Sequence, residues 1–425
     1  MAVPFLALEG FYRFGDVVPI GAPLRVSSDV YWVGVNDSET KFFEGIWDIP
    51  EGVSYNSYIV KGSEKTALID SVLGKFEEEH FEKIGRLVNL SEIDYLIINH
   101  MEPDHTGALP KLFEKASQVQ VILTPIALNM LKNFYHIEPK ILLVRGDDVR
   151  IDLGGKTLRF IQTPWLHWPE TMCTYLMEER ILFSCDAFGS FKRLPEGSVL
   201  ESDMENVDQY MNDASKQYFA GVFSGHREWV LKAIRKFEDM NIETQVLAPS
   251  HGPVYSANAK EIINKWAAWS RPTYTRNVVV AVGSMYGMTT KFVKSIVEGI
   301  EEARGKALVY DLTGNAPVEV LAAVVDAPAL MIGTPTYEHD LFPRVKNFLN
   351  LLETKKLSDK FVGVFGSFGW SGEATKKLTE QLSALGFKLV GKPLAVIGSP
   401  LQEDLEKAKV LAKMVTETAF SERRL

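Results

Sequence analysis

Short apolar stretches separated by polar and turn residues recur along the first part of the chain. Runs rich in β-branched and apolar residues predict strands at 29–35, 55–61, 66–70, 93–99, 120–123, 157–162, 174–177, 180–184 and 244–248. Helical spacing of apolar residues predicts helices at 75–87, 126–135 and 227–239. Because these elements mix without simple alternation, the pattern predicts an α/β domain with two sheets.

The pattern changes near residue 270. Apolar strands then alternate with amphipathic helices, at 277–282, 307–311, 329–333, 361–365 and 388–397, which is typical of a doubly wound parallel sheet. Pro272 would stop a helix, so we expect one domain over residues 1–270 and a second over residues 271–425. A chain of 425 residues is long enough for both.

Histidines and carboxylates gather in loops that follow predicted strands. NHMEPDH comes directly after an apolar run, and three later loops, TPWLHWPET, LFSCDAFG and LAPSHGP, each add one residue of the same kind. Loops at strand ends are where a rigid sheet presents functional groups. The candidate metal ligands are His100, Glu102, Asp104, His105, His167, Asp186 and His251.

This ligand set favours two metal ions, because a single zinc ion needs only three or four ligands. Three carboxylates against two divalent cations leave a residual charge near plus one, which accommodates a change of oxidation state. Imidazole and carboxylate suit non-haem iron. Both cysteines, Cys173 and Cys185, are assigned to the core, so the set contains no sulfur. We expect no catalytic residue beyond the ligands.

The loops of the second domain offer another site. GSMYGMTTK has hydroxyls and a glycine ahead of a helix that begins near Thr289, an arrangement that binds phosphate through backbone amides and the helix dipole. No dinucleotide or NTP fingerprint is present. Two later loops carry aromatic residues suited to a flat isoalloxazine ring. The candidate FMN-binding residues are Ser284, Met285, Tyr286, Gly287, Met288, Thr289, Thr334, Pro335, Thr336, Tyr337, Ser367, Phe368, Gly369, Trp370, Ser371 and Gly372.

In their order, HMEPDH, LHWPE, CDAFG and SHG resemble the metallo-β-lactamase fold in its flavodiiron branch, and residues 277–415 resemble the flavodoxin family. The hydrolases of this superfamily have HxHxDH, with histidine where this chain has Glu102. The resemblance implies an αββα sandwich followed by a flavodoxin-like sheet. It also implies one iron on His100, Glu102 and His167, another on Asp104, His105 and His251, and Asp186 bridging them.

The resemblance further implies an activity. FMN would relay electrons to the two irons, which would reduce oxygen to water or nitric oxide to nitrous oxide. The family arrangement is a head-to-tail homodimer, alone or as a dimer of dimers, with the FMN of one subunit beside the di-iron site of the other. A separate rubredoxin is the expected electron donor.

The composition limits the partners and the cell compartment that we expect for this protein. A net charge of -9 argues against nucleic acid and anionic membranes as partners, and no run reaches the length of a membrane span. Two cysteines are too few for a disulfide framework. The segment Met1–Asp16 lacks the basic stretch of a signal peptide. We therefore expect a cytoplasmic protein.

Two other interpretations stay open. The first is a di-zinc hydrolase fused to a flavin domain, which metal analysis would distinguish. The second is an electron carrier with a vestigial metal site, although the intact ligands in all four loops argue against it.

Overall fold

The computed structural model describes residues 21–425, so the segment Met1–Asp16 lies outside the described residues. The described chain forms two compact units. The first comprises residues 21–41, 49–215 and 229–264, and the second comprises residues 42–48, 216–228 and 265–425. Each unit encloses its own hydrophobic core, as a domain does. The expected domain boundary after residue 270 stays a prediction.

The first unit contains two large sheets. One has the order β1 (Leu24–Arg25), β2 (Val30–Trp32), β7 (Tyr58–Lys61), β8 (Thr66–Ile69), β9 (Tyr95–Ile97), β10 (Gln120–Leu123) and β11 (Lys140–Leu143). The other has the order β12 (Arg150–Asp152), β13 (Thr157–Gln162), β14 (Met172–Leu176), β15 (Ile181–Cys185) and β16 (Val246–Pro249).

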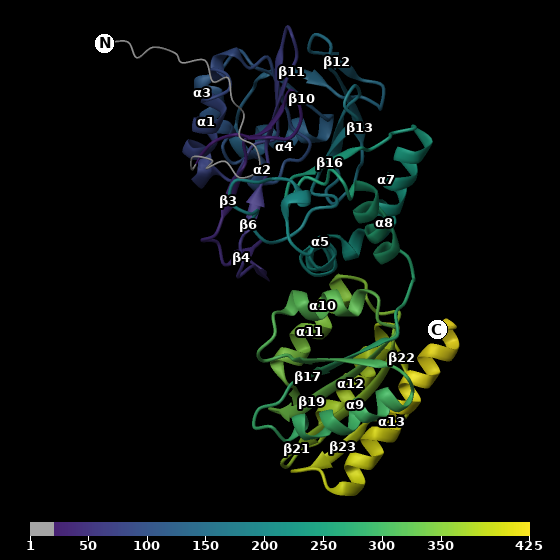
Figure 1. Cartoon of the computed structure of the whole chain (residues 1–425). Helices are drawn as coiled ribbons and strands as arrows, with labels where there is room; N and C mark the ends of the chain where they lie inside the picture. Colours follow the sequence, from purple (N-terminus) through teal and green to yellow (C-terminus); the bar gives the residue numbers. More distant parts are fainter. Residues whose placement is uncertain (1–20) are drawn as a thin grey trace. The chain divides into compact units, whose positions relative to one another are not determined.

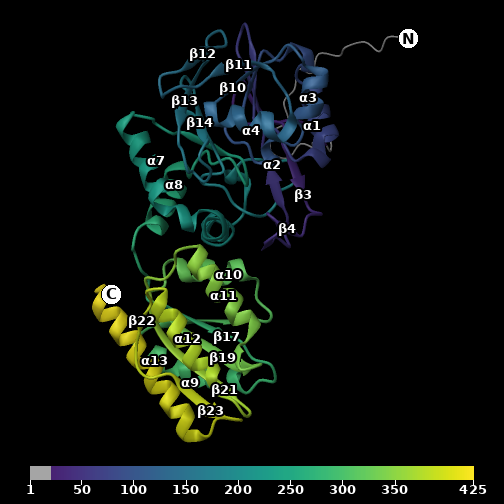
Figure 2. The same ribbon diagram turned by 180° about the vertical axis from the view of Figure 1, so that it is seen from behind.

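The two sheets pack face to face with helices outside them. Ile97 and Ile122 of one sheet share a core cluster with Phe160 and Phe183 of the other. Leu68, on the opposite face of its strand, is also fully buried, so that face is covered as well. Helices α1 (Glu77–Gly85) and α3 (Leu109–Lys115) lie on one side of this unit and α7 (Arg227–Asp239) on the other (Figures 1 and 2). The predicted αββα sandwich is confirmed.

Two predicted strands of this unit are interrupted. The stretch 29–35 becomes β2 and β3 (Val35–Asp37), and 55–61 becomes β6 (Val53–Tyr55) and β7. The second break follows from Asn56. Its side chain donates to the carbonyl groups of Pro249 and Gly252, each at 2.8 Å, and its backbone N–H donates to Ser250. These bonds draw the backbone away from the ladder and toward the end of β16.

The second unit is a parallel sheet with the order β18 (Lys306–Asp311), β17 (Asn277–Val282), β19 (Ala329–Tyr337), β21 (Phe361–Phe368) and β22 (Lys388–Leu389). The predicted strand 388–397 is divided, because the chain turns at Gly391 with φ at +72°. Its second half, β23 (Leu394–Ile397), also pairs with β21. This order is that of a flavodoxin-like doubly wound sheet.

The remaining elements cover or connect these sheets. In the second unit, α9 (Val293–Glu302) and α13 (Gln402–Arg423) pack against each other and against the sheet. Across residues 21–425, no helix combines the length and the apolar character needed to cross a membrane. Besides short 3-10 and π-helical turns, the other α-helices and strands of the described residues are β4 (Phe42–Phe43), β5 (Trp47–Asp48), α2 (Pro103–Thr106), α4 (Pro125–Tyr135), α5 (Val207–Tyr210), α6 (Lys216–Tyr218), α8 (Ala259–Ser270), α10 (Pro317–Val325), β20 (Asp340–Leu341), α11 (Pro343–Thr354) and α12 (Glu373–Ala384).

Candidate metal and flavin sites

Both sheets of the first unit deliver the predicted metal ligands from their strand ends. His100 and Glu102 follow β9, and the short helix α2 carries Asp104 and His105. The other three ligands follow β13, β15 and β16. All seven residues come together in one cluster, which consists of His100, Glu102, Asp104, His105, His167, Asp186 and His251. Their role as metal ligands stays a prediction.

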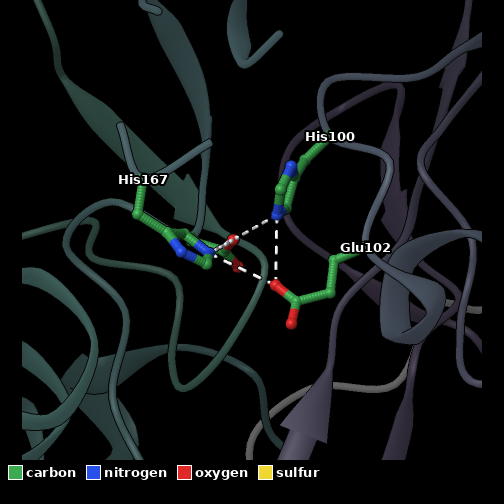
Figure 3. Close-up of side chains that lie close together, drawn as sticks. His100, Glu102 and His167 are labelled. Atoms are coloured by element: carbon green, nitrogen blue, oxygen red, sulfur yellow. Dashed lines mark hydrogen bonds and ion pairs between the residues drawn. The ribbon is translucent and has the colours of Figure 1, made fainter. Parts of the chain in front are cut away.

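The first ligand group joins His100, Glu102, His167 and one oxygen of Asp186. Figure 3 shows the imidazoles of His100 and His167 directed at the Glu102 carboxylate. Their Nε2 atoms lie 3.2 and 3.3 Å from Glu102 Oε2. The same two nitrogens lie 3.4 and 3.1 Å from Asp186 Oδ2. Two nitrogens and two oxygens therefore converge on one point.

The second group joins Asp104, His105, His251 and the other oxygen of Asp186. The Nε2 atoms of His105 and His251 lie 2.9 and 3.1 Å from Asp186 Oδ1. Each of them is also 3.4 Å from an oxygen of Asp104. Asp186 thus directs one carboxylate oxygen to each group, which is the placement expected of a bridging ligand.

The carboxylates of the cluster make its histidines basic. Burial would lower the pKa of each imidazole, but hydrogen bonds and charges from neighbouring carboxylates outweigh it. The pKa is raised to about 10 for His100 and His251 and to about 9 for His105 and His167. The pKa values of Glu102 and Asp186 lie below their usual range despite burial, because histidines surround them. A divalent cation would bind this set by displacing the protons.

Several atoms of the cluster fit a bound metal. His105 Nε2 lies within ion-pair distance of Asp104 Oδ1 and Asp186 Oδ1, but among the described residues none of these three buried atoms has a partner in hydrogen-bonding geometry. Buried polar atoms normally have one, so a cation between them would satisfy all three. Cys185, assigned to the core from sequence, is buried and borders His105 and Asp186. Burial raises the pKa of its thiol well above the usual value, which opposes binding as a thiolate.

Two residues that contact the predicted ligands from outside the cluster were not among the predicted site residues. Glu170 Oε1 lies 2.7 Å from His100 Nδ1, and the carbonyl oxygen of Ser54 lies 2.8 Å from His251 Nδ1. Glu170 stands three residues after His167 in LHWPE, which was the only signal for it. No feature of the sequence pointed to Ser54, because it contacts His251 through its backbone carbonyl. Trp168 packs edge-to-face on His100, with ring centroids 4.9 Å apart.

A cavity of about 300 Å³ lies among the predicted FMN loops of the second unit. A contact of 2.9 Å between Thr289 Oγ1 and Ser367 Oγ joins two of these loops. Tyr286 and Trp370 are 87% and 74% exposed, so each ring has open surface for stacking on a planar ligand, although the Trp370 ring also packs edge-to-face with His339. The cavity is lined by Ser284, Met285, Tyr286, Met288, Thr289, Pro335, Thr336, Ser367, Phe368, Gly369, Trp370 and Gly398.

The other predicted FMN residues lie beside this cavity rather than on its wall. Gly287, with φ at +83°, donates its N–H to Ser284 Oγ at 3.0 Å and shapes the first loop. Gly398, which follows β23, lines the cavity and was missed because the predicted strand ended without a recognised loop. The predicted residues that do not line the cavity are Gly287, Thr334, Tyr337, Ser371 and Gly372.

Known proteins resemble both units. Residues 53–252 match the ODP family beta lactamases, and residues 280–410 match the flavodoxins. A nitric oxide reductase of Moorella thermoacetica is 30% identical over 92% of this chain and 98% of its own length. A coenzyme F420H(2) oxidase of Methanothermobacter marburgensis is 33% identical over 86% of this chain and 91% of its own.

Solved structures agree with the sequence matches. The rubredoxin oxygen:oxidoreductase from Desulfovibrio gigas has a TM-score of 0.89 and 26% identity, and covers 94% of this chain and 99% of its own. The flavodiiron protein from Giardia intestinalis has a TM-score of 0.89 and 27% identity, and covers 95% and 98%. Fold and site define an oxidoreductase that joins a metallo-β-lactamase-like unit to a flavodoxin-like unit. The chain belongs to the flavodiiron protein family.

Proposed function

We propose that this protein reduces oxygen to water, or nitric oxide to nitrous oxide, at a non-haem di-iron centre supplied with electrons through FMN. The proposal rests mainly on the position of Asp186, because its two carboxylate oxygens face two separate ligand groups. Seven nitrogen and oxygen ligands suit iron. When bound, the irons would supply gas binding and electron transfer to the gas.

The chain's own residues would set the charge and the geometry of this centre. Three carboxylates neutralise most of the charge of two divalent cations, and the strand ends fix their positions. The oxygen reaction takes up four electrons and four protons, and the nitric oxide reaction takes up two of each. Bound FMN would let these electrons pass to the metal centre one at a time. The flavodoxin-like unit has a cavity with aromatic side chains at its rim that suits this flavin.

The partners we propose follow from the resemblance and from the relatives. One similar structure is described as a rubredoxin oxygen:oxidoreductase and one relative as a nitric oxide reductase, which supports rubredoxin as donor and both gases as candidate substrates. A head-to-tail homodimer would bring FMN of one subunit to the metals of the other. We place the reaction in the cytoplasm, where the two buried cysteines stay reduced.

Metal and flavin analysis, followed by anaerobic turnover of the reduced protein with each gas in turn, tests the proposal. We expect iron and FMN, and consumption of at least one gas. Zinc without gas consumption would instead support a di-zinc hydrolase. Gas reduction that survives replacement of both Glu102 and Asp186 by Ala would show that this cluster is a vestigial site.

A further inference from the structure

Glu170 is a buried carboxylate that touches the metal cluster from outside. Its side chain is fully buried, and its Oε1 lies 2.7 Å from His100 Nδ1 and accepts the Met101 backbone N–H at 3.0 Å. The other nitrogen of His100 faces Glu102 and Asp186. One imidazole therefore connects the cluster to an additional negative charge.

The charge of Glu170 is directed at His100. Among the described residues, its one ion pair is with that imidazole, and its second oxygen, Oε2, has no hydrogen-bond partner. Glu170 also lines a cavity of about 360 Å³ with Gln162 and Thr171. Arg145 lines the same cavity but forms no ion pair with Glu170 among the described residues, so the closest charged contact of this carboxylate is the His100 imidazole.

The second ligand group has no such support. His251 Nδ1 meets a neutral backbone carbonyl, that of Ser54, at 2.8 Å. His105 Nδ1 is buried without a hydrogen-bond partner in the described part of the chain. A carboxylate thus supports His100 and a neutral carbonyl supports His251, whereas His105 Nδ1 has no such partner among the described residues. A carboxylate raises the basicity of a ligating imidazole more than a carbonyl does.

We propose that Glu170 is a positioning residue that makes the two metal positions electronically unequal. Its carboxylate holds the His100 proton on Nδ1 and leaves Nε2 free for the metal. Its negative charge favours the higher oxidation state of the iron beside His100, which then has the lower reduction potential of the pair. With two irons bound, the position held by His105 and His251 would therefore be reduced first. This inference rests on the proposed di-iron function.

Two substitutions separate the charge of Glu170 from its hydrogen bond. In Glu170→Gln, an oxygen acceptor remains, so we expect the iron content of the unmodified protein and a smaller gap between the two one-electron potentials. In Glu170→Ala, the anchor of His100 is lost, and we expect iron affinity to fall about 10- to 100-fold. Potentiometric titration followed by Mössbauer spectroscopy measures the gap, and competition with a chelator measures the affinity.

Glu201→Gln is the matched control, because Glu201 is also a fully buried carboxylate but accepts backbone N–H groups of Ala257 and Asn258 away from the cluster. It should leave both potentials unchanged. Unchanged potentials and affinity in both Glu170 variants would overturn the inference. If the unmodified protein holds zinc and consumes no gas, the proposed function fails. Weaker zinc binding by Glu170→Ala would then still support the positioning role.

Discussion

Asp186 is the residue on which the proposed metal centre would depend most. Its two oxygens meet four different histidines at distances of 2.9 to 3.4 Å. In Asp186→Asn the shape remains, but the negative charge and one acceptor oxygen are lost. We expect iron to be lost from both positions, with a larger fall in affinity than the 10- to 100-fold typical of a residue that only supports a ligand. Metal content after dialysis against a chelator checks this.

Asp213→Asn is the control for this experiment, because Asp213 binds Lys192 at 3.1 Å and belongs to neither ligand group. It should retain iron. An Asp186→Asn protein that keeps the iron content of the unmodified protein would contradict the bridging role.

His80 gives the first unit a pH-dependent stability. It is fully buried, and its Nδ1 lies 2.9 Å from the carbonyl oxygen of Val33. Burial lowers its pKa from 6.5 to about 4. As the pH falls, His80 therefore takes up its proton at a higher pH in the unfolded chain than in the folded protein. The stability that neutral His80 contributes is complete above about pH 6.5 and is lost as the pH falls through about 4, a change of about 3 kcal/mol.

Urea unfolding of the unmodified protein and of His80→Gln, at pH 7 and at pH 4, isolates this contribution. Glutamine does not titrate, so the free energy of unfolding of His80→Gln should fall less between pH 7 and pH 4 than that of the unmodified protein. The other titrating groups are common to both proteins and cancel in the comparison. Equal losses in the two proteins would show that His80 is not responsible.

The seven clustered side chains could be predicted from sequence, whereas the residue that contacts His100 from outside the cluster could not. A histidine or carboxylate directly after an apolar strand is visible in one dimension, as at His100 and Asp186. Glu170 meets His100 only because the loop after β13 folds across the end of β9, a contact between residues 70 positions apart. A single sequence does not contain that proximity.

At the scale of elements, some strands were predicted to the residue, whatever their length, and others were not. The strands β13 and β17 have the predicted bounds, because their residues pack on one or both faces of a sheet. The predictions were wrong where one side chain redirected the backbone, as at Asn56, or where a turn divided a strand, as at Gly391. The short hairpin of β4 and β5 has two-residue strands, which are below the length that periodicity can detect.

The contact between α9 and α13 depends on a glycine. A Cβ added at Gly299 would lie 2.2 Å from the backbone oxygen of Lys409 and 3.2 Å from the Cβ of Ala412. We therefore expect Gly299→Ala to push the helices apart and to cost about 1–3 kcal/mol. In an open helix the same change would stabilise by about 0.5–1 kcal/mol. Urea unfolding and retention of FMN during gel filtration measure the effect.

Gly85→Ala, in the last position of α1, supplies the comparison. A Cβ there has no neighbour within 4 Å, so this variant should be at least as stable as the unmodified protein, by up to about 1 kcal/mol, and should retain its flavin. If Gly299→Ala is as stable as Gly85→Ala, the close approach of α9 and α13 is not required for stability.

At the scale of the whole molecule, each site is complete within its own unit. All seven predicted metal ligands belong to the first unit, and all residues that line the flavin cavity belong to the second. The proposed reaction would therefore require electrons to pass between the two units. The proposed head-to-tail dimer makes this a transfer between subunits.

A mixture of two inactive variants tests transfer between subunits. Asp186→Asn removes the metal site, and Thr336→Trp, at a half-buried position on the cavity wall, blocks FMN. If electrons cross between subunits, a mixed dimer has one intact junction, with FMN from the first chain and metal from the second. Random mixing should then recover roughly a quarter of the gas reduction of the unmodified protein, because half of the dimers are mixed and each has one of two junctions. If transfer occurs within a chain, no mixed dimer has a working pair, and the mixture stays as inactive as its components.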